Sequence, residues 1–205
     1  MTNSAAQAPA GTKVATWKID PGHSTVEFVA KHMMITSVRG RFPDVEGTIR
    51  FDEENIANSS VEATIQVATV TSGSEQRDQH LRTGDFFLVD EHPTFTFKST
   101  RIEPKGSDEY KVTGDLTIRG VTKQITLDAT FEGRNTSPWG AEAIGFSATT
   151  TINRKDFGVN WNVGLEAGGV LVSDKIKLDL NIQAVKNVEQ AGTEAQAETE
   201  TSSKA

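Results

Sequence analysis

Hydrophobic and polar residues alternate with a period of two through much of the chain between residues 15 and 186. Tyr110, Val112, Leu116 and Ile118, for example, alternate with polar residues. The same pattern covers residues 26–30, 45–51, 61–67, 95–97, 125–131, 144–152 and 176–184. Because successive side chains of a strand point to opposite faces, each segment predicts a strand with one dry face and one wet face. The chain is therefore predicted to form about eight strands.

Strands with one polar face are typical of antiparallel sheet, and turn signals separate them at residues 20–22, 104–108 and 119–120. Such strands close into either a sandwich or an up-and-down barrel. A strand length of about nine to eleven residues favours a barrel with an open bore. We therefore predict an all-β fold, a single antiparallel lipocalin-like β-barrel of about eight strands with a short helix.

Other segments depart from the alternation. Residues 74–81 predict the short helix, with Ser74 as its cap, and residues 153–174 predict a long glycine-rich loop that contains Phe157 and Trp161. Residues 1–14 and the acidic stretch 187–205 have too few large apolar residues to pack against a core, so we predict disordered tails on either side of one domain at 15–186.

Composition narrows the function. No apolar run approaches the roughly 20 residues of a membrane-spanning helix, and a net charge of -7 argues against nucleic-acid partners. The absence of cysteine excludes disulfides, thiolate catalysis and cysteine-ligated metals. Residues 1–13 have neither a cationic start nor an apolar stretch, which predicts a cytoplasmic location. The alternative is a periplasmic protein whose signal peptide has been removed.

Several polar groups are candidates for chemistry. Asp20, His23 and Ser24 are the residue types of a hydrolytic triad, but their spacing favours a turn. None of the four histidines forms an i, i+4 pair, so we expect neither a metal site nor a cofactor. Arg77 and His80 are three residues apart on the predicted helix, where they either clamp an anionic head group or close one barrel end.

A second basic cluster, Arg39 and Arg41 with Val38 and Phe42 beside them, lies either at a pocket mouth or on an ordinary charged rim. The phenylalanines on the dry faces either fill a core or line a ligand cavity, since a barrel of about eight strands has room for one or the other. Composition alone leaves both alternatives open.

The chain resembles the YceI-like proteins along nearly all of the predicted barrel. The resemblance rests on 17–24 (WKIDPGHS), 38–42 (VRGRF), 77–81 (RDQHL), 85–87 (DFF), 92–97 (HPTFTF), 116–123 (LTIRGVTK), 153–158 (NRKDFG) and 173–176 (SDKI). It implies a lipocalin-like barrel whose apolar bore holds a long amphipathic lipid, typically a polyisoprenoid such as an isoprenoid quinone or a polyprenyl phosphate. Related proteins are seen as dimers, so a homodimer is one expected state.

With this resemblance, we predict a lipid-binding protein and not an enzyme, since the family has no settled catalytic residues to carry over. The predicted lining of the bore is Phe28, Phe42, Phe86, Phe95, Phe97, Leu116, Leu127, Phe146, Trp161, Leu178 and Leu180. Arg77 and His80 are the predicted head-group contacts. The alternatives are a lipid-modifying enzyme with His80 as its base, and a structural or stress protein with a solidly packed barrel.

Overall fold

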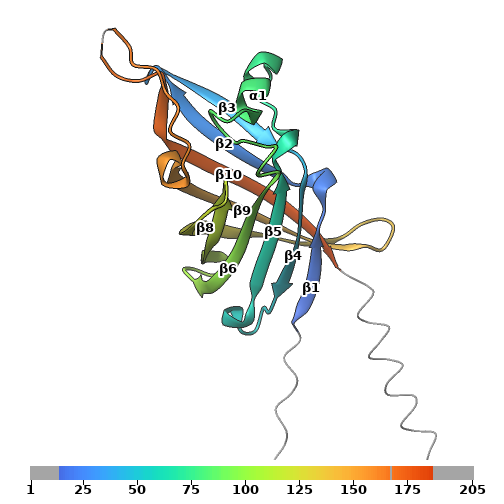
Figure 1. Ribbon diagram of the computed structural model, residues 1–205. Coiled ribbons are helices and arrows are strands. Elements are labelled where there is room, and N and C mark those ends of the chain that lie inside the picture. Colours follow the sequence, from blue (N-terminus) through green and yellow to red (C-terminus); the bar gives the residue numbers. More distant parts are fainter. Residues whose placement is uncertain (1–13, 167, 187–205) are drawn as a thin grey trace, which may run out of the picture.

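The computed structural model describes residues 14–166 and 168–186 as ten strands, one α-helix and four short 3-10 helices (Figure 1). The strands are β1 (Ala15–Ile19), β2 (Thr25–His32), β3 (Thr36–Phe42), β4 (Val45–Phe51), β5 (Ser60–Gln66), β6 (Thr94–Pro104), β7 (Glu109–Ile118), β8 (Val121–Thr136), β9 (Glu142–Asn153) and β10 (Val172–Lys186). The helices are α1 (Glu75–Arg82), η1 (Pro21–His23), η2 (Ile56–Asn58), η3 (Val67–Thr69) and η4 (Arg154–Phe157). No described helix is long and apolar enough to cross a membrane. Apart from residue 14, the predicted tails lie outside the described residues.

The strands form a closed antiparallel barrel. They pair in the order β1-β4-β5-β6-β7-β8-β9-β10, and β10 pairs back with β1. The long strand β10 carries β2 along its N-terminal half and β1 along its C-terminal half, so β1 and β2 occupy one strand position interrupted by η1. The β3 and β4 strands, separated by two residues, share another position, next to β2 and β1 respectively. Ten segments therefore make eight strand positions, which confirms the predicted fold class.

The alternation missed two segments as separate strands, β1 and β3. In β3, the inward position between Val38 and Phe42 is Gly40, which interrupts the apolar pattern. The ring of Phe28 on β2 lies over Gly40 and fills the space that a side chain would occupy. The predicted loop at 153–174 was also partly wrong, because it includes the end of β9, the helix η4 and the start of β10.

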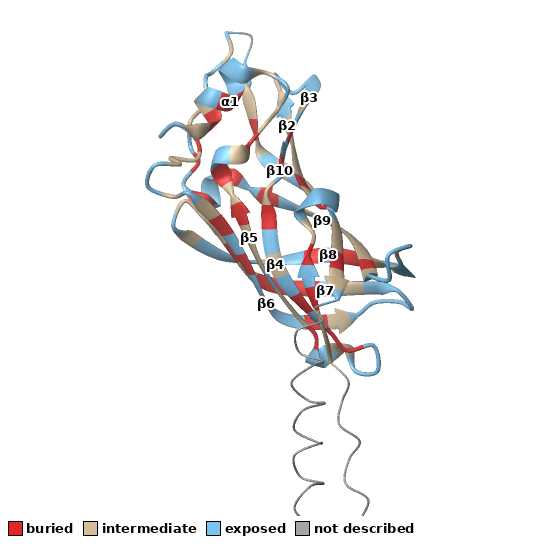
Figure 2. Cartoon of the chain, turned by 90° about the vertical axis from the view of Figure 1, so that its right-hand side faces the viewer, coloured by how far each residue is buried: buried red, intermediate tan, exposed pale blue. Residues whose placement is uncertain are grey.

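The inner face of the barrel is apolar, and burial alternates along the strands (Figure 2). On β6, Phe95 and Phe97 are buried, while Thr96 and Lys98 between and beside them are exposed. The buried residues fall into two clusters, one of them around Trp17 and Phe42 and the other around Leu127 and Phe157. The two clusters lie in different parts of one barrel interior, where they surround the cavities described below.

The helix α1 begins one residue later than predicted, and Ser74 lies at the predicted cap position, where its carbonyl accepts a hydrogen bond from the Asp78 nitrogen at 2.9 Å. The Ser74 side chain makes no capping hydrogen bond. Instead, the buried Asp78 carboxylate accepts hydrogen bonds from the Ser72 main-chain nitrogen, at 2.8 Å, and from the Ser72 hydroxyl. Because Leu81 is buried on the same helix, these contacts fix α1 over one end of the barrel.

The residues that resemble a triad form the turn around η1. The Asp20 carboxylate accepts hydrogen bonds from the Gly22 nitrogen, at 2.9 Å, and from the Gln183 amide of β10, at 3.2 Å, and it pairs with His23 Nδ1 at 2.7 Å. The buried Ser24 hydroxyl donates to the Gln183 carbonyl at 3.1 Å. Their role is to join β1 and β2 where both lie against β10.

This turn predicts an acid-dependent contribution to stability. The hydrogen bond with His23 is the main cause that lowers the pKa of Asp20, with the Gly22 and Gln183 bonds acting in the same direction. Above the ordinary aspartate pKa of about 3.9 the carboxylate therefore stabilises the fold, and this is lost as the pH falls through the lowered value. We expect Asp20→Asn to be less stable than the wild type at pH 6 and equally stable near pH 2, by urea unfolding. If the difference in the free energy of unfolding between Asp20→Asn and the wild type is the same at pH 6 and pH 2, the Asp20 carboxylate is not the source of this stability.

Candidate functional site

Two cavities lie end to end inside the barrel. The first has a volume of about 330 Å³ and the second of about 150 Å³. They share four lining side chains, Val26, Ile65, Leu116 and Leu178. These four come from β2, β5, β7 and β10 and lie between the two cavities, and we call them the waist.

The first cavity lies at the α1 end of the barrel. Its wall includes an aromatic cluster of Phe28, Phe42, Phe87 and Phe95, whose neighbouring ring centroids are 5.3 to 6.5 Å apart. Trp161, from the segment after η4, packs against Phe86 at 5.2 Å. The predicted lining residues placed here are Phe28, Phe42, Phe86, Phe95 and Trp161, together with Leu116 and Leu178 at the waist.

The second cavity occupies the other end of the barrel and is almost entirely apolar. Phe51, Phe131 and Phe146 pack together near its wall, with centroids 5.3 to 5.4 Å apart. Burial, as the main cause, raises the pKa of Tyr110, so this lining phenol stays neutral near pH 7. The predicted lining residues placed here are Phe97, Leu127, Phe146 and Leu180, again with Leu116 and Leu178.

The charged side chains that line the bore are all basic. The first cavity has Lys31, Arg77 and Arg154, along with His32 and His80, and the second has Arg50. Among the described residues, no aspartate or glutamate lines either cavity. The first cavity therefore combines an apolar wall with a concentration of basic side chains, whose positive charge suits an anionic group.

The structure brings Arg77 and His80 together at the first cavity, as the helix spacing predicts, but both are already bonded. The Arg77 guanidinium donates to the Ser72 hydroxyl at 2.7 Å and to the Ser72 carbonyl at 2.8 Å. His80 Nε2 lies 2.8 Å from an Asp85 carboxylate oxygen, and its ring packs edge-on against Trp161, 4.8 Å away. These contacts fix both side chains at the cavity wall.

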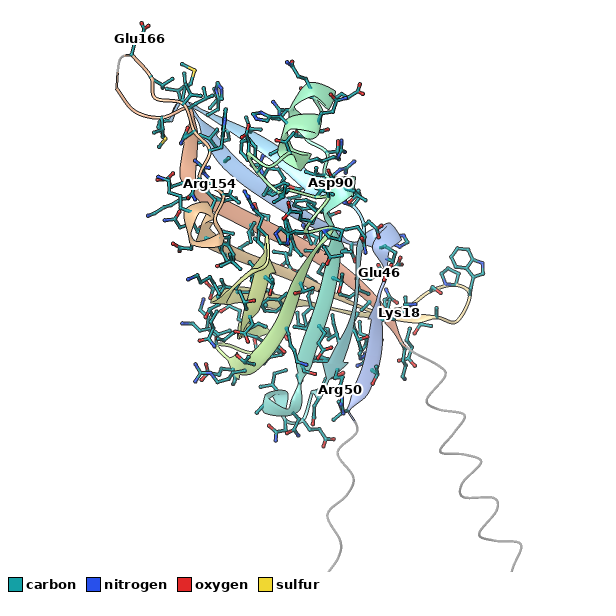
Figure 3. The ribbon with its side chains drawn as sticks, viewed as in Figure 1. Lys18, Glu46, Arg50, Asp90, Arg154 and Glu166 are labelled. Atoms are coloured by element: carbon teal, nitrogen blue, oxygen red, sulfur yellow. The ribbon has the colours of Figure 1, made fainter. Side chains whose placement is uncertain are left out.

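Arg154 is the most buried charged residue of the site, and the sequence reasoning did not select it. Only 5% of Arg154 is exposed. Its Nη1 donates to the Val159 and Trp161 carbonyls at 2.9 and 2.8 Å, and its Nε donates to the Ser173 carbonyl at 3.0 Å. Burial lowers its pKa, and the nearby Asp174 carboxylate, 3.5 Å from Nη2, opposes this shift. Figure 3 labels Arg154 beside η4, and its three hydrogen bonds hold the Trp161 segment against β10.

The second basic cluster divides between the two faces of β3. Val38 and Phe42 line the first cavity, while Arg39 and Arg41 are exposed on the outer face. The two arginines therefore belong to a charged rim, and only their apolar neighbours belong to the pocket. Within the described part of the chain, no group of three metal-ligating side chains gathers anywhere.

A domain model described as a YceI-like domain matches residues 17–184, which is nearly the whole barrel. The chain belongs to the YceI-like family. Curated relatives of this YceI-like protein include a UPF0312 protein of Vibrio parahaemolyticus, 39% identical over 74% of this chain and 81% of the relative. A UPF0312 protein of Pseudomonas aeruginosa is 37% identical over 84% of this chain and 87% of the relative.

Solved structures agree with the YceI-like fold. The Campylobacter jejuni YceI protein is 34% identical, with a TM-score of 0.66 over 77% of this chain and 90% of that one. Burkholderia cenocepacia BcnA is 26% identical, with a TM-score of 0.70 over 80% of this chain and 98% of that one. A domain from Saccharophagus degradans, described as polyisoprenoid-binding, shares the fold at 17% identity and a TM-score of 0.62, over 85% of this chain and all of that one.

Proposed function

We propose that this YceI-like protein binds one long-chain amphipathic lipid, a polyisoprenoid such as an isoprenoid quinone or a polyprenyl phosphate, and stores or transports it. In this proposal the chain lies along the bore through the waist, and the polar end group lies in the first cavity. The observation that carries the proposal is the pair of end-to-end apolar cavities with basic side chains concentrated in one of them. The Saccharophagus domain described as polyisoprenoid-binding supports the ligand class.

Packing energetics favour an occupied bore over an empty one. Protein interiors are close-packed, and unfilled apolar space costs about 24 cal/mol per Å³. A sealed and empty cavity of 330 Å³ would cost at most about 8 kcal/mol, and the first cavity is partly open to solvent, which lowers this cost. This upper limit is comparable with the whole stability of a domain, about 5–15 kcal/mol. A ligand that fills the bore removes this cost.

The surroundings of His80 favour binding over catalysis. The His80 and Asp85 pair resembles the base and orienting group of a hydrolase. Such a pair needs a nucleophile within hydrogen-bond reach. Among the described residues that line the first cavity there is no serine, threonine or tyrosine. In the binding proposal this pair fixes the wall beside Trp161.

The proposal is tested by mass spectrometry of an organic extract of the purified protein. We expect a polyisoprenoid at close to one molecule per chain. After delipidation and refolding, geranylgeranyl phosphate is the probe and stearate is the unbranched comparison. A probe at 100 times its Kd should stabilise the fold by about 2.7 kcal/mol. Absence of any extracted lipid, together with no stabilisation by either probe, overturns the binding function and leaves the packed-barrel alternative.

A further inference from the structure

Four of the five large apolar side chains that are exposed in the described chain gather in one place. They are Met33, Met34, Ile35 and Val163, with exposed fractions of 42, 58, 75 and 46%. We call this group the apolar tip. Single exposed apolar residues are ordinary, but a cluster on an otherwise polar surface marks an interaction site. The fifth such residue, Trp139, lies elsewhere, in the turn between β8 and β9.

The apolar tip is built from two segments that are far apart in the sequence. Met33 to Ile35 form the turn between β2 and β3, and Val163 lies between η4 and β10. The Met33 nitrogen donates to the Leu171 carbonyl at 2.8 Å, and the Leu171 nitrogen donates to the Val163 carbonyl at 2.9 Å. Figure 1 shows the hairpin and the loop before β10 side by side at this end of the barrel. The two segments therefore present one surface.

The turn between β2 and β3 places two residues other than glycine in a backbone conformation that favours glycine. Met33 and Met34 have φ values of 51° and 63°, in the left-handed region that glycine and asparagine adopt at the least cost. Two consecutive methionines in such a turn exchange local backbone stability for exposed, flexible apolar side chains. A turn that only connects two strands would be more stable with glycine or asparagine at these two positions.

The apolar tip adjoins the first cavity. Leu171, which bonds to Met33, lines that cavity, and so do Lys31 and His32, which immediately precede Met33. The basic residues at the end of the bore are thus directly next to the exposed apolar side chains of the tip. A lipid bilayer has the complementary arrangement, because its acyl chains can contact the apolar tip while its phosphate groups contact the basic residues.

We propose that the apolar tip docks onto a lipid bilayer, with Met33, Met34, Ile35 and Val163 inserted among the head groups. In this arrangement Lys31 lies at the phosphate level, and a lipid passes between the bilayer and the first cavity without crossing water. The exchange of lipid rests on the function proposed above, while the docking does not. Glu166, labelled in Figure 3, lies farther out on the same loop, and its negative charge opposes attraction to an anionic lipid surface. We therefore expect docking to depend on apolar insertion and not on charge attraction.

The test is flotation of the full chain with phosphatidylcholine vesicles. We expect the wild type to float with the vesicles and to remain bound in about 0.5 M salt, where exposed charges are screened. The double variant Met34→Glu, Ile35→Glu should reduce the bound fraction at least tenfold. The matched control is Trp139→Glu, which changes an even more exposed residue, next to the C-terminal end of β10 and away from the tip. It should bind vesicles as the wild type does.

Two further measurements separate docking from ligand binding and from self-association. The double variant should still bind geranylgeranyl phosphate in solution, because its substitutions lie outside the bore. A wild type that does not float, or a double variant that floats equally well, overturns the docking proposal. The proposal is also overturned if the double variant binds vesicles normally but has a different oligomeric state by sedimentation. The tip is then a contact between two copies of the chain. Wild-type protein that floats but binds no probe supports docking and counts against the proposed function.

Discussion

Replacing Arg154 with methionine is expected to lower the free energy of unfolding by about 3–5 kcal/mol, measured by urea unfolding. Methionine keeps a flexible chain of similar reach but donates no hydrogen bond. The change therefore leaves the carbonyls of Val159, Trp161 and Ser173 without the donors they now have, and it leaves the Asp174 carboxylate without its buried partner. The Trp161 segment should detach from β10 and open the first cavity.

The neighbouring Lys155 provides a matched control, because it pairs with the same Asp174 carboxylate, at 2.9 Å, from an exposed position. Exposed ion pairs contribute little, so Lys155→Met should leave the unfolding curve almost unchanged. If Arg154→Met does not fold, Arg154→Lys keeps the charge but lacks the planar fork that reaches three carbonyls, and it should show a smaller loss. A loss below about 1 kcal/mol for Arg154→Met would show that its buried contacts are not stabilising.

Phe97→Gln is expected to weaken the binding of geranylgeranyl phosphate at least tenfold, which is about 1.4 kcal/mol. Phe97 is 9% exposed and lines the second cavity, so glutamine puts an amide without partners into an apolar bore. Its ring lies over Gly114 on β7, where an added Cβ would be 2.5 Å from the ring. The ring therefore packs against Gly114 and also lines the cavity. The delipidated variant should lose less than the 3–5 kcal/mol typical of a fully packed phenylalanine.

The control for Phe97 is the next residue on the same strand. Lys98 points outward and pairs with Glu62 at 2.7 Å, so Lys98→Gln introduces the same side chain on the other face of β6. Both probe affinity and stability should stay close to wild type. If Phe97→Gln costs the full 3–5 kcal/mol and leaves probe binding unchanged, the second cavity is packed core and the ligand chain does not pass the waist.

The dry faces of the strands were predictable because strand side chains alternate with a period of two, whatever the strand's neighbours are. Phe95 and Phe97 on β6 needed only this rule, and so did Leu178 and Leu180 on β10. All eleven residues predicted to line the bore do lie along the two cavities. Their contact with a lipid is part of the proposal above.

Short elements were harder to predict, because their stability comes from partners far along the chain. β1 has five residues, and its place is set by pairing with β4 on one side and with β10, more than 160 residues away, on the other. Similarly, Gly40 breaks the alternation of β3 until the Phe28 ring of β2 covers it. Local periodicity contains no information about such distant contacts.

For the site, the sequence by itself determined which residues face inward and that basic residues lie near one end of the bore. Only the tertiary structure decided that the inward side chains stop short of filling the barrel, because cavity volume depends on the circumference set by eight paired strand positions. It also decided the role of Arg154, which in the sequence is one basic residue beside another. The guanidinium is buried and donates to three carbonyls from two separate segments, so it holds these segments together. A buried donor is stabilising only where folding brings its acceptors to it.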